Sequence, residues 1–492
     1  MPQNPPQNAS TDAPRTPSQD APQTAAPRTD PAEPGKLPAR AWAVFLLVVA
    51  ADVLDLLSTT VTNLAAPTVV RDLGASASLE PWLGASYTLA LGSVMIVGGR
   101  LGDRFGCRRM FLVGLAGFTL GSLAAAAAGS PLLLVAARAG QGAFGGLLVP
   151  QGFVLLLRVV PRASMRVVFG LFGPLLAASS ISGPVVAGLL IGADPYGLGW
   201  RSVFLVNVLL GVLLLAAGAA CLPRIAGDSA VRIRPGAAAA LMAGLGLLLA
   251  GLVDGGASGW GPRPLGTAAA GSIVLALLVR QQAGAGQPLL ERSLFANRGF
   301  VAGLVLGALF CSAVAGTGYV VTLYLQQQLG LGPLHAALVS APMSVGIIAS
   351  SFAVRRHITE HGRAVVSAGV ALFAAGVAGT AALVAVRPDP VPWIGVPLLV
   401  TGLGMGCCFG AVFAVALGDV GEHEAGSASG VLNAVQQLVT AAGSAGVSTL
   451  YLATRTGDAA SGVLPCLGLA LAVAAACGAA VPLLPRRGAD VH

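Results

Sequence analysis

Two carboxylates stand inside an apolar run near residues 42–64, where ionised groups are expensive. Asp52 and Asp55 are three residues apart, and Ser58 continues the same face of a predicted helix. A charged carboxylate at mid-bilayer costs about 2.5–3.5 kcal/mol on insertion scales. Burial favours its protonated form, whereas a nearby cation favours the ionised form. Asp55 is therefore the candidate proton carrier and Asp52 a second one, with a structural carboxylate that pairs for helix packing as the alternative.

A single arginine lies deep in another apolar run, near residues 132–157. Arg138 begins the motif Arg138-Ala-Gly-Gln141-Gly142 and would lie roughly 10 Å from the outer edge, close to the depth of Asp55. Because no acid is evident deep in any other run, Asp55 is its expected partner. The pair either opens during a functional cycle or is a static structural ion pair.

A short basic turn joins two further apolar runs. It reads Gly99-Arg-Leu-Gly-Asp-Arg-Phe-Gly-Cys-Arg-Arg-Met110. Glycines let the chain reverse tightly, and Asp103 can meet an arginine or a helix N-terminus. The residues expected to hold this end of the helices together, as a cytoplasmic gate, are Gly99, Asp103, Arg104, Gly106 and Arg108. Arginines alone would also fit a turn that merely lies on the cytoplasmic side.

Composition places most of the chain in lipid. Of 492 residues, 55% are hydrophobic and 10% charged, whereas soluble domains carry roughly 25% charged residues. The net charge of +8 comes from arginines clustered between apolar runs, which argues against nucleic acid. The five histidines and seven cysteines show no metal-ligand spacing, and no phosphate-binding loop occurs. We expect no metal, no nucleotide, no other cofactor and no covalent catalysis.

Hydropathy predicts an all-α polytopic membrane protein with fourteen spans. The proline-rich residues 1–40 are expected to be a disordered tail, and 486–492 a second tail. If the N-terminus is cytoplasmic, 22 of the 28 lysines and arginines fall in cytoplasmic tails and loops. Because cytoplasmic loops carry an excess of Lys and Arg, this distribution predicts that both termini are cytoplasmic. The spans are expected near 42–64, 82–100, 110–129, 132–157, 166–191, 202–222, 237–254, 265–280, 300–325, 334–354, 364–386, 391–416, 427–452 and 462–484.

A weak repeat of the basic turn at residues 359–363 indicates two halves of six helices, 41–223 and 298–485, with two inserted helices at 235–281. Proteins built from such halves bind substrate at their interface, near the midplane. The polar side chains that could line that cavity, each also able to make an ordinary helix–helix hydrogen bond, are Asn63, Tyr87, Gln141, Gln151, Tyr319, Tyr324, Gln326, Asn433, Gln436 and Gln437.

These motifs resemble those of the major facilitator superfamily, specifically its fourteen-span drug/proton antiporters. The basic turn matches the loop signature Gly-x-Leu-x-Asp-Arg-x-Gly-x-Arg-Arg. The doubled Gly-Pro spacing around Gly183 and Pro184 resembles the antiporter signature, although generic helix packing also explains it. Further matching stretches are Thr60–Pro67, Trp82 with Tyr87, Trp200–Asn207, Leu294–Phe300, Tyr324 with Gln326, and Gly426–Gly430. Ser58 stands where the family often has a second aspartate, and Cys107 where a basic residue is common.

The resemblance implies a monomeric, multi-pass transporter of the cell membrane rather than an enzyme. It would exchange protons for a hydrophobic drug or antibiotic, a cation being one option, by alternating access. A proton-coupled symporter or exporter of an endogenous metabolite is the nearest alternative. A non-transporting membrane sensor and a lipid-modifying membrane enzyme are rivals of other classes, but the sequence offers neither an interaction domain nor clustered catalytic residues.

Overall fold

The computed structural model is all-helical throughout its described part. It describes residues 38–75, 80–161, 168, 197–231, 233–282, 292–354, 357–387, 391–418, 420, 424–454 and 459–483. Thirteen helices of 20 residues or more occur there, and the short α9 (Arg292–Ala296) precedes α10. The long helices are α1 (Ala39–Asp72), α2 (Glu80–Phe105), α3 (Cys107–Ala126), α4 (Pro131–Val159), α6 (Arg201–Cys221), α7 (Pro235–Ser258), α8 (Pro262–Gln282), α10 (Arg298–Leu323), α11 (Pro333–Val354), α12 (Ile358–Val386), α13 (Val391–Gly418), α14 (Ala425–Thr454) and α15 (Ala459–Ala480).

Thirteen of the fourteen predicted spans coincide with these helices. The predicted span 166–191, which contains Gly183 and Pro184, lies outside the described residues. Twelve of the helices are long and apolar enough to cross a membrane. The long helix outside that set is α14, whose Ser, Thr, Asn and Gln side chains lower its hydropathy. A polar helix within a bundle of apolar ones is expected where side chains face an interior cavity rather than lipid.

The first helix is longer than hydropathy predicts, because α1 continues to Asp72 instead of ending near residue 64. Its end is fixed by the start of α6. The indole of Trp200 and the guanidinium of Arg201 each donate a hydrogen bond of 2.9 Å to Asp72 Oδ2. These two hydrogen bonds hold the pKa of the exposed Asp72 carboxyl below its ordinary value.

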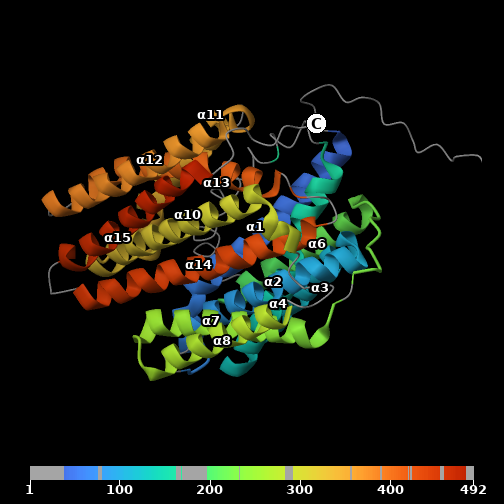
Figure 1. Ribbon diagram of the computed structural model, residues 1–492. Coiled ribbons are helices and arrows are strands. Elements are labelled where there is room, and N and C mark those ends of the chain that lie inside the picture. Colours follow the sequence, from blue (N-terminus) through green and yellow to red (C-terminus); the bar gives the residue numbers. More distant parts are fainter. Residues whose placement is uncertain are drawn as a thin grey trace, which may run out of the picture.

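Helices close in sequence pack together. In the N-terminal part, α2 and α3 both pack against α4, and α3 also packs against α6. In the C-terminal part, α11 and α12 pack against α13, and α10 and α12 pack against α15. Figure 1 shows these as two neighbouring groups, coloured blue to green and yellow to red. The groups meet where α14 packs against α2 and α4.

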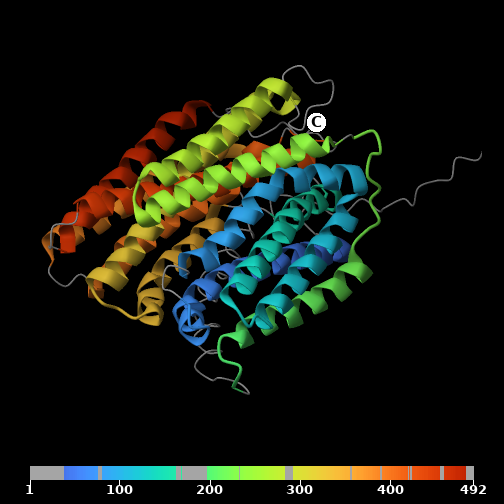
Figure 2. The same ribbon diagram turned by 90° about the horizontal axis from the view of Figure 1, so that it is seen from below.

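The two inserted helices form a hairpin that contacts both groups. Helix α7 packs against α8, and it also packs against α2 and α14 (Figure 2). Near the C-terminal end of α7, Ser448 donates a 2.5 Å hydrogen bond to the Gly256 carbonyl, and the Trp260 indole donates one of 2.6 Å to Thr449. In the segment that leads into α7, the Asp228 amide donates a 2.8 Å hydrogen bond to the Asp103 carbonyl.

Helices α11 and α13 approach so closely that glycines occupy their contact. A Cβ at Gly402 would lie 1.9 Å from the Met343 carbonyl oxygen. We expect Gly402→Val to destabilise the protein by about 1–3 kcal/mol, because the two backbones must separate, and to lower its melting temperature in detergent. The control is Gly468→Ala in α15, where a Cβ meets no atom within 4 Å. Equal melting temperatures for the two variants would contradict this packing.

Candidate transport site

Asp55 is held inside the helix bundle by Tyr87. The Tyr87 hydroxyl of α2 donates a hydrogen bond to Asp55 Oδ1 of α1. The guanidinium of Arg138 lies over the Tyr87 ring, 4.3 Å from its centroid. Within the described residues, no nitrogen of Arg138 lies within 4.0 Å of a carboxylate oxygen. The direct ion pair expected from the sequence is therefore replaced by an arrangement in which Tyr87 contacts both charged groups.

Arg138 is completely buried and uses neutral acceptors. Its Nη1 donates to Ser58 Oγ at 2.8 Å and to Gln141 Oε1 at 2.6 Å, and its Nε donates to the Leu83 carbonyl at 3.3 Å. Gln141 in turn donates to Ser58 at 3.0 Å and to Ser122 at 2.7 Å. The Nη2 of Arg138 has no hydrogen-bond partner among the described residues. Ser58 thus accepts from the arginine without neutralising it.

The sequence explains why these groups meet. Asp55 and Ser58 share one face of α1 by their three-residue spacing, and Arg138 and Gln141 share one face of α4 in the same way. The aromatic ring of Tyr87 enters from α2, which packs against both helices. Asp52 lies one helical turn from Asp55 on α1, and no hydrogen bond or ion pair involves it in the described part of the chain.

The basic turn forms a closed contact at the other end of α2. Ser427 of α14 donates a hydrogen bond of 3.3 Å to Asp103 Oδ2. Gly99 and Gly426 bring the two backbones together, since a Cβ at Gly99 would lie 2.2 Å from the Gly426 carbonyl oxygen. Arg100, like Asp103, is buried. The closure is therefore made between α2 and α14, whereas the sequence analysis predicted a gate role for the α2 residues alone.

The other residues of the turn connect α2 and α3 to their neighbours. Gly106 adopts φ +92° directly before α3, which allows the sharp reversal between the two helices. Arg108 donates a 2.7 Å hydrogen bond to the Ala219 carbonyl at the end of α6. The guanidinium of Arg104 lies 5.3 Å from the centroid of its neighbour Phe105.

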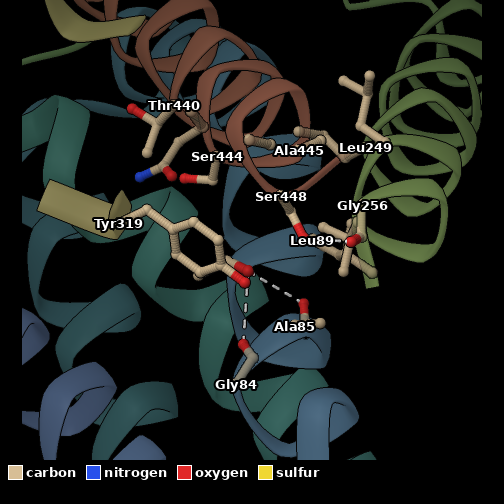
Figure 3. Close-up of a pocket in the computed structure, with 15 residues that line it drawn as sticks. Gly84, Ala85, Leu89, Leu249, Gly256, Tyr319, Thr440, Ser444, Ala445 and Ser448 are labelled. Carbon is tan, nitrogen blue, oxygen red and sulfur yellow. Dashed lines mark hydrogen bonds between the residues drawn. The ribbon is translucent and has the colours of Figure 1, made fainter. Parts of the chain in front are cut away.

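A cavity of about 300 Å³ lies between the two groups of helices (Figure 3). Its walls come from α2, α7, α10 and α14. Tyr319 and Gln437, two of the polar residues expected to line a cavity, do line it. The full lining is Gly84, Ala85, Thr88, Leu89, Leu249, Leu252, Val253, Gly256, Tyr319, Gln437, Thr440, Ala441, Ser444, Ala445 and Ser448.

The structure places the remaining predicted cavity residues elsewhere, outside the lining of this cavity. Gln151 donates to the Gly98 carbonyl at 2.8 Å and so links α4 to α2, while Asn433 donates to the Ser429 carbonyl of its own helix at 2.9 Å. Tyr324 is buried in the π-helical turn Tyr324–Gln328, and the Gln326 side chain is exposed. Tyr87 contacts Asp55, and Gln141 accepts a hydrogen bond from Arg138. Gln436 is half-buried, and the side chain of Asn63 lies outside the described residues.

Most of the lining was not anticipated, including Gly84, Ala85, Thr88 and Leu89 of α2. Thr440, Ser444 and Ser448 continue the face of Gln437 at spacings of three and four, which is a helical period visible in the sequence. The contribution of α7 had no comparable signal, because its lining residues are apolar or glycine, like the rest of that helix.

The chain matches known proteins over most of its length. Residues 48–444 match the model of the Major Facilitator Superfamily. A probable actinorhodin transporter of Streptomyces coelicolor is 38% identical, over 92% of this chain and 80% of that protein. The tetracenomycin C resistance and export protein of Streptomyces glaucescens is 32% identical, over 85% and 77%. The cephamycin export protein CmcT of Amycolatopsis lactamdurans is 33% identical, over 86% and 90%.

A solved structure has the same fold. The human organic anion transporter MFSD10 superposes with a TM-score of 0.63 at 16% identity, covering 90% of this chain and all of that one. The chain therefore belongs to the major facilitator superfamily. It is a multi-pass membrane transporter, as the helices and the family together require.

The hydrogen bond from Tyr87 to Asp55 is testable by its effect on stability. Tyr87→Phe removes a donor to a carboxylate, which is worth about 1.5–3 kcal/mol when the acceptor is charged. Tyr451→Phe removes the acceptor of a hydrogen bond that the neutral Gln328 amide donates, worth about 0.5–1.5 kcal/mol. We expect the melting temperature in detergent at pH 8 to fall further for Tyr87→Phe. A smaller or equal fall would contradict a charged acceptor at Asp55.

Proposed function

We propose that this chain exports hydrophobic small molecules of the antibiotic type across the cell membrane in exchange for protons. Three relatives that match more than four-fifths of it carry names of antibiotic transporters or exporters. The exchange would use the two six-helix halves at 41–223 and 298–485, with the inserted hairpin at 235–281 between them in sequence. Both termini would be cytoplasmic, in agreement with the distribution of arginines.

The observation that carries proton coupling is the contact of Asp55 with Tyr87 beneath Arg138. When Asp55 is ionised, the Tyr87 hydroxyl donates to a charged acceptor, and the nearby guanidinium stabilises that charge. When a proton binds, the acceptor loses its charge and this hydrogen bond weakens. A proton on Asp55 therefore changes how tightly α1 holds α2. Asp52, one turn away, is the second proton site in this proposal.

Helix α2 connects this change to the rest of the site. Gly84, Ala85, Thr88 and Leu89 of α2 line the cavity. Tyr87 lies in the same stretch of α2, on another face of the helix. At its C-terminal end, Gly99 and Asp103 make the closed contact with α14. A movement of α2 that follows protonation would alter the cavity and this contact together, which is what coupled exchange requires.

In the described conformation, the contact of Gly99 and Asp103 with α14 closes one end of the interface between the two helix groups. Its basic residues mark that end as cytoplasmic. The cavity lies nearer the opposite end of α2, at residues 84–89. The conformation is thus closed to the cytoplasm. Gly183 and Pro184 are proposed to support exchange from the predicted span 166–191.

Replacing the proposed proton carrier tests the mechanism. Asp55→Asn keeps the size of the side chain but cannot bind and release a proton. In proteoliposomes loaded at acidic pH, we expect the wild type to accumulate tetracenomycin C, the compound named for one relative, together with proton efflux. We expect Asp55→Asn to reduce both to the level of empty liposomes, while its melting temperature remains close to that of the wild type.

The matched control is Asp72→Asn, a carboxylate at the exposed end of the same helix, which should retain proton-coupled transport. Unchanged coupled transport by Asp55→Asn would exclude Asp55 as the carrier. Accumulation driven only by an acidic exterior would identify a symporter instead.

A further inference from the structure

The cavity has two chemically different walls. One wall is apolar: Leu89 of α2 faces the cavity together with Leu249, Leu252 and Val253 of the inserted helix α7. A polar wall comes from α10 and α14, with the side chains Tyr319, Thr440 and Ser444 (Figure 3), and Gln437 of α14 also lines the cavity. Most of the apolar wall thus comes from α7 of the inserted hairpin.

The polar wall has unused hydrogen-bonding capacity. Within the described part of the chain, the side chains of Tyr319, Gln437, Thr440 and Ser444 make no hydrogen bond. Two other lining hydroxyls are already engaged with backbone: Thr88 donates to the Ala85 carbonyl at 3.1 Å and Ser448 to the Gly256 carbonyl at 2.5 Å. These four polar groups can therefore bind donors and acceptors of a ligand.

The described lining of the cavity carries no charged side chain. None of its described lining residues is Asp, Glu, Lys, Arg or His. A cation or an anion that entered would lose hydration without gaining a counter-charge, and burying an unpaired charge costs far more than burying a paired polar group. Asp55 does not compensate, because it is outside the lining and already accepts from Tyr87. The cavity therefore selects against ionised ligands of either sign.

The shape of the walls favours a flat ligand. Residues with small side chains from three helices form part of the lining: Gly84, Ala85, Gly256, Ala441 and Ala445. A ligand could therefore pack against their backbone as well as against the Tyr319 ring. A cavity of about 300 Å³ is at the lower end of the range for small-molecule sites. It can hold a compact aromatic molecule with a few polar substituents on one edge.

We propose that this cavity binds uncharged, planar aromatic molecules with polar groups along one edge, and that α7 is a specificity-determining wall of it. The polar edge binds to α10 and α14, and the apolar face packs on α7 and Leu89. This inference rests on the proposed export function for its physiological meaning. The sequence analysis left open whether the substrate is neutral or cationic, and this inference favours a neutral substrate.

Three matched fluorescent probes test the proposal: 9-anthracenemethanol (neutral), 9-(aminomethyl)anthracene (cationic) and 9-anthracenecarboxylate (anionic). We expect purified protein to bind the neutral probe at least about tenfold more tightly than either charged one. Leu252→Trp, which fills the cavity from α7, should weaken neutral-probe binding by about tenfold or more. The control is Leu247→Trp on the exposed side of the same helix, which should bind as the wild type does.

A gain-of-function variant guards against simple misfolding. Ser444→Asp adds a carboxylate to the polar wall and should reverse the preference toward the cationic probe. Equal or tighter binding of a charged probe by the wild type, no binding of the neutral probe, or equal effects of Leu252→Trp and Leu247→Trp would each overturn the proposal. Because binding is measured without a proton gradient, these results are independent of the Asp55→Asn transport experiment, which tests export itself.

Discussion

The transport site depends on a carboxylate that is kept inside the membrane by a tyrosine. A buried carboxylate needs hydrogen-bond donors and a nearby positive charge. Asp55 receives both through one side chain, since Tyr87 donates to it while the Arg138 guanidinium lies on the Tyr87 ring. Arg138 is itself supported by uncharged acceptors, Ser58 and Gln141. The arginine therefore stabilises the carboxylate without being bound to it, and a proton can reach Asp55 without the rupture of an ion pair.

The same interaction gives α2 its central position. Tyr87 lies in α2 between cavity-lining residues, and the C-terminal turn of that helix carries the contact with α14. In the proposed mechanism, the three events that a transporter has to coordinate all act on this 26-residue helix. A rigid helix transmits displacement along its axis, so coordination needs no further chain of contacts. The close approach of Gly99 to Gly426 brings the backbones of α2 and α14 into direct contact in this conformation.

The sequence predicted the helices well and the site only in part. Hydropathy locates a span along the chain, and charge locates Asp55 and Arg138 at similar depth. Depth is one coordinate, however, and the direction in which a side chain leaves its helix depends on packing. For this reason the sequence paired Asp55 directly with Arg138 and did not anticipate that Tyr87 contacts both. Consecutive residues on a helix point about 100° apart, which is why Gln437 lines the cavity while Gln436 does not.

The inserted hairpin imposes a constraint on any exchange cycle. The segment before α7 is bound to the α2–α3 region, through the Asp228 amide and the Asp103 carbonyl. The other end of α7 is bound to α14, through Gly256 with Ser448 and through Trp260 with Thr449. If α2 and α14 separate at Gly99, α7 cannot keep both attachments unchanged. Because α7 forms a cavity wall, its displacement alters the cavity when the cytoplasmic contact opens.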